Sequence, residues 1–209
     1  MRADEFITEA PLPPDWDKEV YKPQTSFAKR LRYATEKAKK LGTGSSRVAF
    51  EIEHEGRATV LKIAKNKKGL AQNEYESQML NDYYVRPLNI TIPIIDFDEE
   101  HNQPLWIHTE KATKVKPTEF KKYFNGMSPD ELIHFARWFK GEQQVSAEVE
   151  EKYQAIHEED GPACSFADLV ANFDTAIADF GRLANWGIYK GTVVIIDIGG
   201  SSDIITSMY

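Results

Sequence analysis

Two glycine-bearing segments, far apart in the chain, combine residue types that could do chemistry. Gly42-Thr43-Gly44-Ser45-Ser46 precedes an apolar strand pattern, and glycines there would let backbone N–H groups approach a phosphate closely. Asp197 follows the apolar run 192–196 and precedes Gly199, so its carboxylate would lie at a strand end, where it suits magnesium. Taken alone, either pattern is also typical of an ordinary turn.

A lysine in an apolar strand pattern is the third candidate. Lys62 has Val60 and Ala64 on its own face, so we expect it on a covered surface rather than in solvent. A buried ammonium needs an anion, because desolvating it unpaired costs several kcal/mol. The anion would be a glutamate of the next helix or the phosphates of a ligand.

Helix phase distinguishes the two glutamates that follow Lys62. The apolar spacing predicts a helix over 69–80 that contains Glu74 and Glu76. Glu76 shares its face with Leu80, because residues four apart are neighbours on a helix. We therefore predict that Lys62 pairs with Glu76, and that Glu74 faces solvent.

Apolar periodicity predicts the elements that would position these residues. An alternating pattern on either side of a turn at 54–57 predicts a hairpin. Further strands are predicted over 89–97, 104–109 and 192–196, and helices over 27–41, 69–80 and 165–180. Strands first and helices afterwards predict an α+β fold in two lobes.

The chain has 209 residues, of which 41% are hydrophobic and 28% charged, which is typical of a globular protein. Its net charge of −7 disfavours nucleic acid and anionic membranes as partners. The single cysteine, Cys164, excludes an internal disulfide and a thiolate metal site. The first residues lack a signal-peptide pattern and no apolar run approaches 18 residues, so we expect a cytoplasmic protein.

The N-terminal region offers two features for contacts. Residues 1–26 contain prolines among acids and are predicted to form an irregular arm with Phe6, Leu12 and Trp16 as anchors. Cations surround the apolar face of the predicted helix 27–41. They would form a solvated surface or bind an acidic or phosphate-bearing partner.

In sequence order, the glycine turn, strand lysine, helix glutamate and Asp-x-Gly resemble the protein kinase-like fold. The strings LGTGSSRVAF, VLKIAKNKKGLAQNEYE, LWIHTE and NWGIYKGTVVIIDIG are especially similar to small kinase-like proteins of tailed bacteriophages. This resemblance implies a mostly antiparallel N-lobe sheet over 27–110 and a reduced helical C-lobe over 111–209. It also implies ATP and magnesium as cofactors.

The resemblance gives the N-lobe residues roles in nucleotide binding. Gly42, Gly44 and Ser45 would cover the phosphates of ATP. Lys62 would bind the α- and β-phosphates and be held by Glu76.

The remaining roles fall on the hinge and the C-lobe. Glu110 to Ala112 would form a hinge whose backbone meets adenine. Asp197 and Asn185 would hold magnesium. Asp179 would be the catalytic base.

Some features depart from the common kinase pattern. Arg47 occupies the position of the third glycine, Asp179 and Asn185 are six residues apart instead of five, and no histidine precedes Asp179. Two functions therefore stay open. One is a minimal ATP- and magnesium-dependent phosphotransferase, in the host cytoplasm or the virion. The other is a pseudokinase that acts as a virion component or binds a host protein through the arm or the basic helix 27–41.

Overall fold

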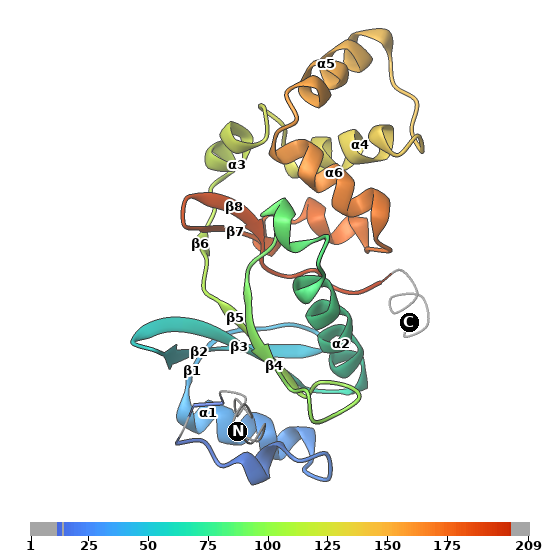
Figure 1. Ribbon diagram of the computed structural model, residues 1–209. Coiled ribbons are helices and arrows are strands. Elements are labelled where there is room, and N and C mark those ends of the chain that lie inside the picture. The colour runs from blue at the N-terminus through green and yellow to red at the C-terminus, as the bar shows by residue number, and fades with distance from the viewer. Residues whose placement is uncertain (1–11, 14, 202–209) are drawn as a thin grey trace, which may run out of the picture. The chain divides into compact units, whose positions relative to one another are not determined.

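The structure is a computed structural model that describes residues 12–201 except residue 14 (Figure 1). These residues form two compact units. The first contains the described residues before Gln78 together with Ile94–Glu110, and the second contains Gln78–Pro93 and the residues from Lys111 onward. The predicted α+β class is confirmed, since the first unit is built on an antiparallel sheet and the second mainly on helices.

The first unit contains a five-stranded antiparallel sheet in the spatial order β1-β2-β3-β5-β4. The strands are β1 (Lys39–Thr43), β2 (Arg47–His54), β3 (Arg57–Ala64), β4 (Ile94–Phe97) and β5 (Trp106–Glu110). β2 and β3 form the predicted hairpin, whose turn places Glu55 and Gly56 at φ of 49° and 74°. Helix α2 (Lys67–Asn81) follows β3.

The N-terminal part of the described chain packs on this sheet. The 3-10 helix η1 (Lys18–Tyr21) and helix α1 (Phe27–Lys37) share one core with the strands. The buried members of that core are Leu12, Trp16, Val20, Tyr21, Ala34, Val48, Phe50, Ile52, Leu61, Ile63, Leu105 and Trp106. Leu12 and Trp16 are thus anchors of the arm onto its own sheet. The third predicted anchor, Phe6, lies outside the described residues.

The helix predicted over 27–41 was too long. Helix α1 ends at Lys37, Ala38 has an extended backbone, and the next five residues form the edge strand β1. Leu41, which we expected in the core, is 42% exposed. Pairing with β2 supplies hydrogen bonds that periodicity within one segment does not reveal, and lysines are common on sheet edges.

Arg30 also differs from the expected solvated cation. Its side chain is buried, its guanidinium donates to the backbone oxygen of Thr25 at 2.6 Å, and it lies 4.9 Å from the ring centroid of Phe27. Burial lowers the pKa of Arg30. The other cations of the predicted segment 27–41 are exposed and remain the candidate surface for a partner.

The second unit combines helices with a small sheet. Its helices are α3 (Pro117–Tyr123), α4 (Pro129–Phe139), α5 (Ala147–Glu158), α6 (Pro162–Asn172) and the 3-10 helices η2 (Arg86–Leu88), η3 (Ile177–Gly181) and η4 (Leu183–Asn185). Its antiparallel sheet contains β6 (Thr113–Lys114), β7 (Trp186–Tyr189) and β8 (Thr192–Ile195). Trp186 packs against Phe120, Phe124, Phe166 and Phe180 in the core.

Two predicted elements are shorter than expected, because part of each forms backbone hydrogen bonds with residues far away in the sequence. The helix predicted over 165–180 ends at Asn172, and the N–H of Ala176 instead donates to the oxygen of Gly200 at 3.1 Å. The strand predicted over 89–97 is divided at Pro93, which has no N–H to donate. Only Ile94–Phe97 joins the large sheet, while the residues just before Pro93 hydrogen-bond to Ile195.

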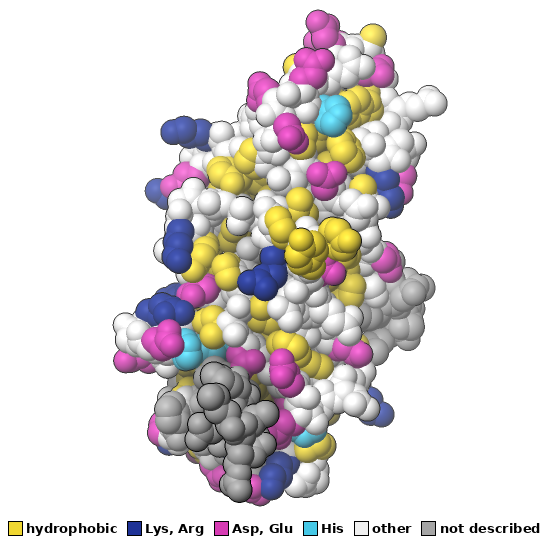
Figure 2. Space-filling model, in the orientation of Figure 1, with side chains coloured by type: hydrophobic (Ala, Val, Ile, Leu, Met, Phe, Trp, Pro, Cys, Tyr) yellow, Lys and Arg dark blue, Asp and Glu magenta, His cyan; other side chains and the backbone are white. Residues whose placement is uncertain are grey.

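The surface shows no dominant charge of one sign on the visible face, where acidic and basic side chains are interspersed (Figure 2). Among the described residues, the large hydrophobic side chains most exposed to solvent are those of Tyr83 and Tyr84, at 81% and 75%. None of the described helices is both long enough and apolar enough to cross a membrane.

A buried histidine lies on β5, between β3 and β4 in the large sheet. His108 on β5 is inaccessible to solvent, and its Nε2 lies 2.7 Å from the hydroxyl of Thr59. Its Nδ1 has no hydrogen-bond partner in the described part of the chain. Burial, aided by nearby His54 and Arg57, lowers the pKa of His108 to about 4.

We predict that His108 destabilises the fold in acid. Its pKa is lower in the folded state than in the unfolded state, so the unfolded chain binds the proton more readily and stability falls as pH drops from about 6.5 toward 4. The loss attributable to this residue approaches about 3 kcal/mol at the acid end. Urea midpoints measured across this range should fall less steeply for His108→Gln than for the wild type. Parallel profiles would contradict the prediction.

Candidate functional site

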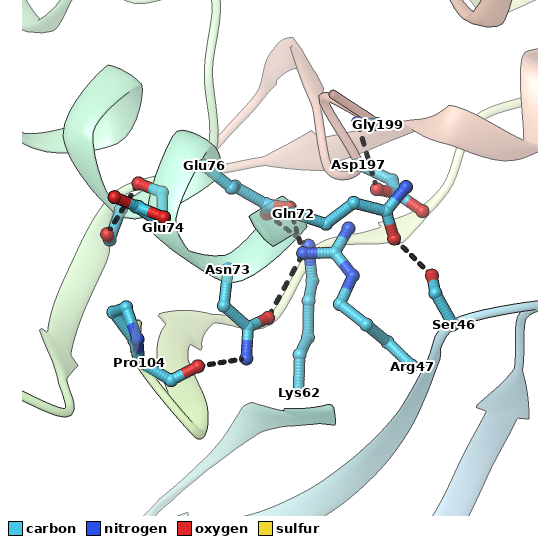
Figure 3. A network of polar contacts seen from close by, with 11 residues as sticks. Ser46, Arg47, Lys62, Gln72, Asn73, Glu74, Glu76, Pro104, Asp197 and Gly199 are labelled. Atoms are coloured by element: carbon cyan, nitrogen blue, oxygen red, sulfur yellow. Dashed lines mark hydrogen bonds and ion pairs between the residues drawn. The ribbon is translucent and has the colours of Figure 1, made fainter. Parts of the chain in front are cut away.

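A buried ion pair connects the large sheet to α2. Lys62 on β3 donates from Nζ to Oε1 of Glu76, as predicted (Figure 3). The side chains of Lys62 and Glu76 are 10% and 1% exposed, so little water screens the pair. Glu74 lies away from this pair and accepts a hydrogen bond from Gln103 at 3.2 Å. Helix phase therefore identified the correct glutamate.

Arg47 is a second cation on the same carboxylate, and sequence reasoning missed it. Its Nη1 lies 2.5 Å from Oε2 of Glu76 and 3.4 Å from Oδ1 of Asn73 (Figure 3). The hairpin register could have revealed it. Lys62 is opposite Ala49, and strand alternation places Arg47, two residues earlier, on the same face as Ala49.

The glycine segment covers the end of β1 and the turn that leads into β2. It therefore precedes an apolar strand as expected, but a further strand, β1, comes before it. Gly42 lies within β1 opposite Ala49. The turn closes where the N–H of Gly44 donates to the oxygen of Arg47 at 2.9 Å. The oxygen of Ser45 accepts a hydrogen bond from Nδ2 of Asn66 at 3.2 Å.

The start of α2 lies directly against this turn. The oxygen of Ser46 accepts a hydrogen bond from the N–H of Lys65 at 2.8 Å, and its hydroxyl contacts Oε1 of Gln72 (Figure 3). A Cβ on Gly69 would overlap the oxygen of Ser46. Only glycine at position 69 allows this approach without a backbone shift.

The predicted hinge residues flank the boundary between the units. Glu110 is the last residue of β5 and of the first unit, and Lys111 begins the second. The carboxylate of Glu110 pairs with Arg57 at 2.9 Å. Ala112 packs in the second unit, where a Cβ on Gly187 would come within 2.7 Å of its Cβ.

The second unit brings together the other predicted site residues. Nδ2 of Asn185 donates to the backbone oxygen of Asp179 at 2.8 Å. The N–H of Gly199 donates to Oδ1 of Asp197 at 3.2 Å (Figure 3). A Cβ on Gly199, whose φ is 77°, would lie 2.5 Å from Oδ2 of Asp179. Asp179, Asn185 and the Asp197–Gly199 turn therefore form one polar cluster.

Two consecutive 3-10 turns connect Asp179 to Asn185. The N–H of Arg182 donates to the oxygen of Asp179, and the N–H of Asn185 donates to that of Arg182. Phe180 is completely buried and contacts Phe166 with ring centroids 5.4 Å apart. Asp179, Phe180 and Gly181 thus lie in the 3-10 helix η3, which the Phe180 ring attaches to the core.

No family model and no curated protein matches this sequence. Solved structures match at low identity. The Mycobacterium tuberculosis PknI kinase domain is 13% identical, with a TM-score of 0.39. The alignment covers 79% of this chain and 59% of that domain, so this chain spans less than two thirds of the domain's length. Aminoglycoside phosphotransferase APH(4)-Ia is 15% identical with a TM-score of 0.38, covering 82% of this chain and 71% of that protein. A thermostable mutant of this phosphotransferase, in ternary complex with AMP-PNP and hygromycin B, is 16% identical with a TM-score of 0.37, covering 78% and 66%.

We predict that Glu76→Ala is more destabilising than Lys62→Ala. Removing Glu76 takes the shared carboxylate from two buried cations, a change that typically costs about 3–5 kcal/mol. Removing Lys62 leaves Glu76 paired with Arg47, so we expect roughly 1–3 kcal/mol. Urea unfolding of both variants measures the difference, and the reverse order would show that Arg47 does not support the carboxylate.

Gly199→Ala should disturb Asp179. The added methyl group would meet the Asp179 carboxylate, and alanine is disfavoured at a φ of 77°. We expect a loss of at least about 1 kcal/mol in stability. Gly191→Ala is a matched control, since its φ is 86° but its Cβ meets no described atom within 4 Å. Equal losses in both variants would mean that only the backbone conformation matters.

Proposed function

We propose that this protein is a kinase-like nucleotide-binding protein of the type found in tailed bacteriophages, which binds ATP with magnesium. The buried Lys62–Glu76 pair carries the proposal, because it joins a strand lysine to a helix glutamate in the order that the kinase-like pattern requires. A glycine turn precedes the pair, as in that pattern.

The glycines themselves support a ligand near the turn. A Cβ on Gly42 would meet no described atom within 4 Å, and one on Gly44 would make only an ordinary contact at 3.6 Å. Packing among the described residues therefore does not demand glycine at either position. Close approach of a phosphate to the backbone N–H groups explains both, with Ser45 between them and Lys62 as the cation. Glu110 to Ala112 would then meet adenine through their backbone.

The polar cluster of the second unit fits a magnesium ion. Asp197 would contribute its carboxylate. Asn185 would contribute Oδ1, because its Nδ2 donates to the backbone oxygen of Asp179. The described residues contain no group of three or more His, Cys, Asp or Glu side chains suited to a metal. Magnesium usually takes only one or two protein ligands and completes its shell with phosphates and water. It would neutralise charge on the phosphates.

As a phosphotransferase, the protein would use Asp179 as the base. Asp179 is half-buried, and its carboxylate lies against Gly199, beside the proposed magnesium ligands. It would accept the proton of an acceptor hydroxyl on a carboxylate oxygen. The rest of catalysis would be positioning and charge stabilisation by Lys62 and the cation.

The alternative is a pseudokinase that acts as a virion component or binds a host protein. The six-residue spacing from Asp179 to Asn185 favours it, since the common catalytic loop has a spacing of five. The exposed cations of α1 are the candidate surface for a partner. In either case the protein would work in the host cytoplasm or the virion.

A thermal-shift titration with ATP, with and without magnesium, tests the proposal. At 100 times its dissociation constant, ATP should stabilise the wild type by about 2.7 kcal/mol. We expect Asp197→Ala to lose the magnesium-dependent part and Asp179→Ala to retain binding. ATP turnover, where present, should fall in both. A wild-type protein that shows no shift would refute nucleotide binding, and binding without turnover would favour the pseudokinase.

A further inference from the structure

Arg47 is not explained by the proposed nucleotide site. We propose that Arg47 is a positioning residue that holds Glu76, and through it Lys62, in the arrangement that binds phosphate. This inference rests on the proposed function. It assigns a role to Arg47, which occupies the position of the third glycine in the kinase-like pattern.

The Glu76 carboxylate receives a cation on each oxygen. Lys62 contacts Oε1, and Arg47 contacts Oε2 at 2.5 Å. A carboxylate held on both oxygens cannot turn toward another group without breaking one of these contacts. Arg47 thereby fixes the carboxylate that orients the Lys62 ammonium.

Arg47 is itself held by Asn73, through the same nitrogen that contacts Glu76. Its Nη1 also lies 3.4 Å from Oδ1 of Asn73, and Nδ2 of Asn73 donates to the oxygen of Pro104 at 3.0 Å (Figure 3). Asn73 is fully buried and the Arg47 side chain is 8% exposed. A continuous set of contacts thus runs from the loop before β5 to Lys62.

The turn before β2 sets the position from which Arg47 reaches α2. Ser46 contacts Gln72, and the close approach at Gly69 brings the backbone of this turn against the helix. A planar guanidinium can bridge Glu76 and Asn73 in a fixed geometry, whereas a lysine ammonium is a point charge on a flexible stem. We therefore expect Arg47→Lys to replace Arg47 only in part.

Preorganised side chains improve affinity, because the cost of ordering them is met before the ligand binds. Arg47→Gln should raise the dissociation constant for ATP with magnesium about three- to tenfold, and Arg47→Lys should restore part of the loss. Calorimetry at a temperature where each variant is folded measures this. Arg32→Gln, which removes an exposed arginine of α1, is the matched control and should bind like the wild type.

A double-mutant cycle with Glu76→Gln separates positioning from direct contact. If Arg47 acts through Glu76, Arg47→Gln should change the affinity less than about twofold in the Glu76→Gln background. An equal loss in both backgrounds would show that Arg47 contacts the ligand itself and would overturn the inference. So would an unchanged affinity accompanied by a lower urea midpoint, which indicates a purely structural role. If Arg47→Gln does not fold, the same cycle is run with Arg47→Lys.

The wild-type titration keeps the two proposals apart. Wild-type protein that fails to bind ATP refutes the nucleotide site, and the role of Arg47 falls with it. Wild-type protein that binds, with an Arg47 effect independent of Glu76, refutes only the positioning role.

Discussion

Removing charged groups from water is the constraint on which the first unit depends. Lys62, Arg47 and Glu76 are nearly inaccessible, and each would be strongly unfavourable there without its partner. Their contacts therefore fix the distance and rotation of α2 relative to β2 and β3. Gly69 permits this distance, because any larger residue would collide with the oxygen of Ser46. The core that contains Val48, Phe50, Leu61 and Ile63 packs on the opposite face of the sheet.

In the second unit, polar groups lie in irregular backbone, and an aromatic core packs against that backbone. Trp186 donates from its indole nitrogen to the oxygen of Phe180 at 2.8 Å, while both rings are buried. This contact fixes the 3-10 turns on either side of Arg182. Asp179 and Asn185 consequently occupy defined positions without belonging to a long helix.

Local patterns were sufficient for part of this structure. The β2–β3 hairpin follows from alternation, and the Lys62–Glu76 pair follows from alternation combined with helix phase. The errors fall where a distant segment decides the outcome. Leu41 matches a helical face until β1 pairs with β2, and Ala176 continues a helical pattern until Gly200 provides a backbone acceptor. Arg47 required a further step, since its importance appears only after the hairpin register is combined with the phase of α2.

The spacing between Asp179 and Asn185 is the main sequence argument against catalysis, and the local backbone weakens it. An additional residue in a loop moves the two ends of the loop apart unless the backbone between them becomes more compact. Here two 3-10 turns make the segment between Asp179 and Asn185 compact, and Asn185 still donates to the oxygen of Asp179. The Asp179 carboxylate also remains against Gly199, two residues after Asp197 in the chain. Asp179, Asn185 and the Asp197–Gly199 turn are therefore kept together despite the altered spacing, so the spacing alone does not exclude the proposed role of Asp179 as a base.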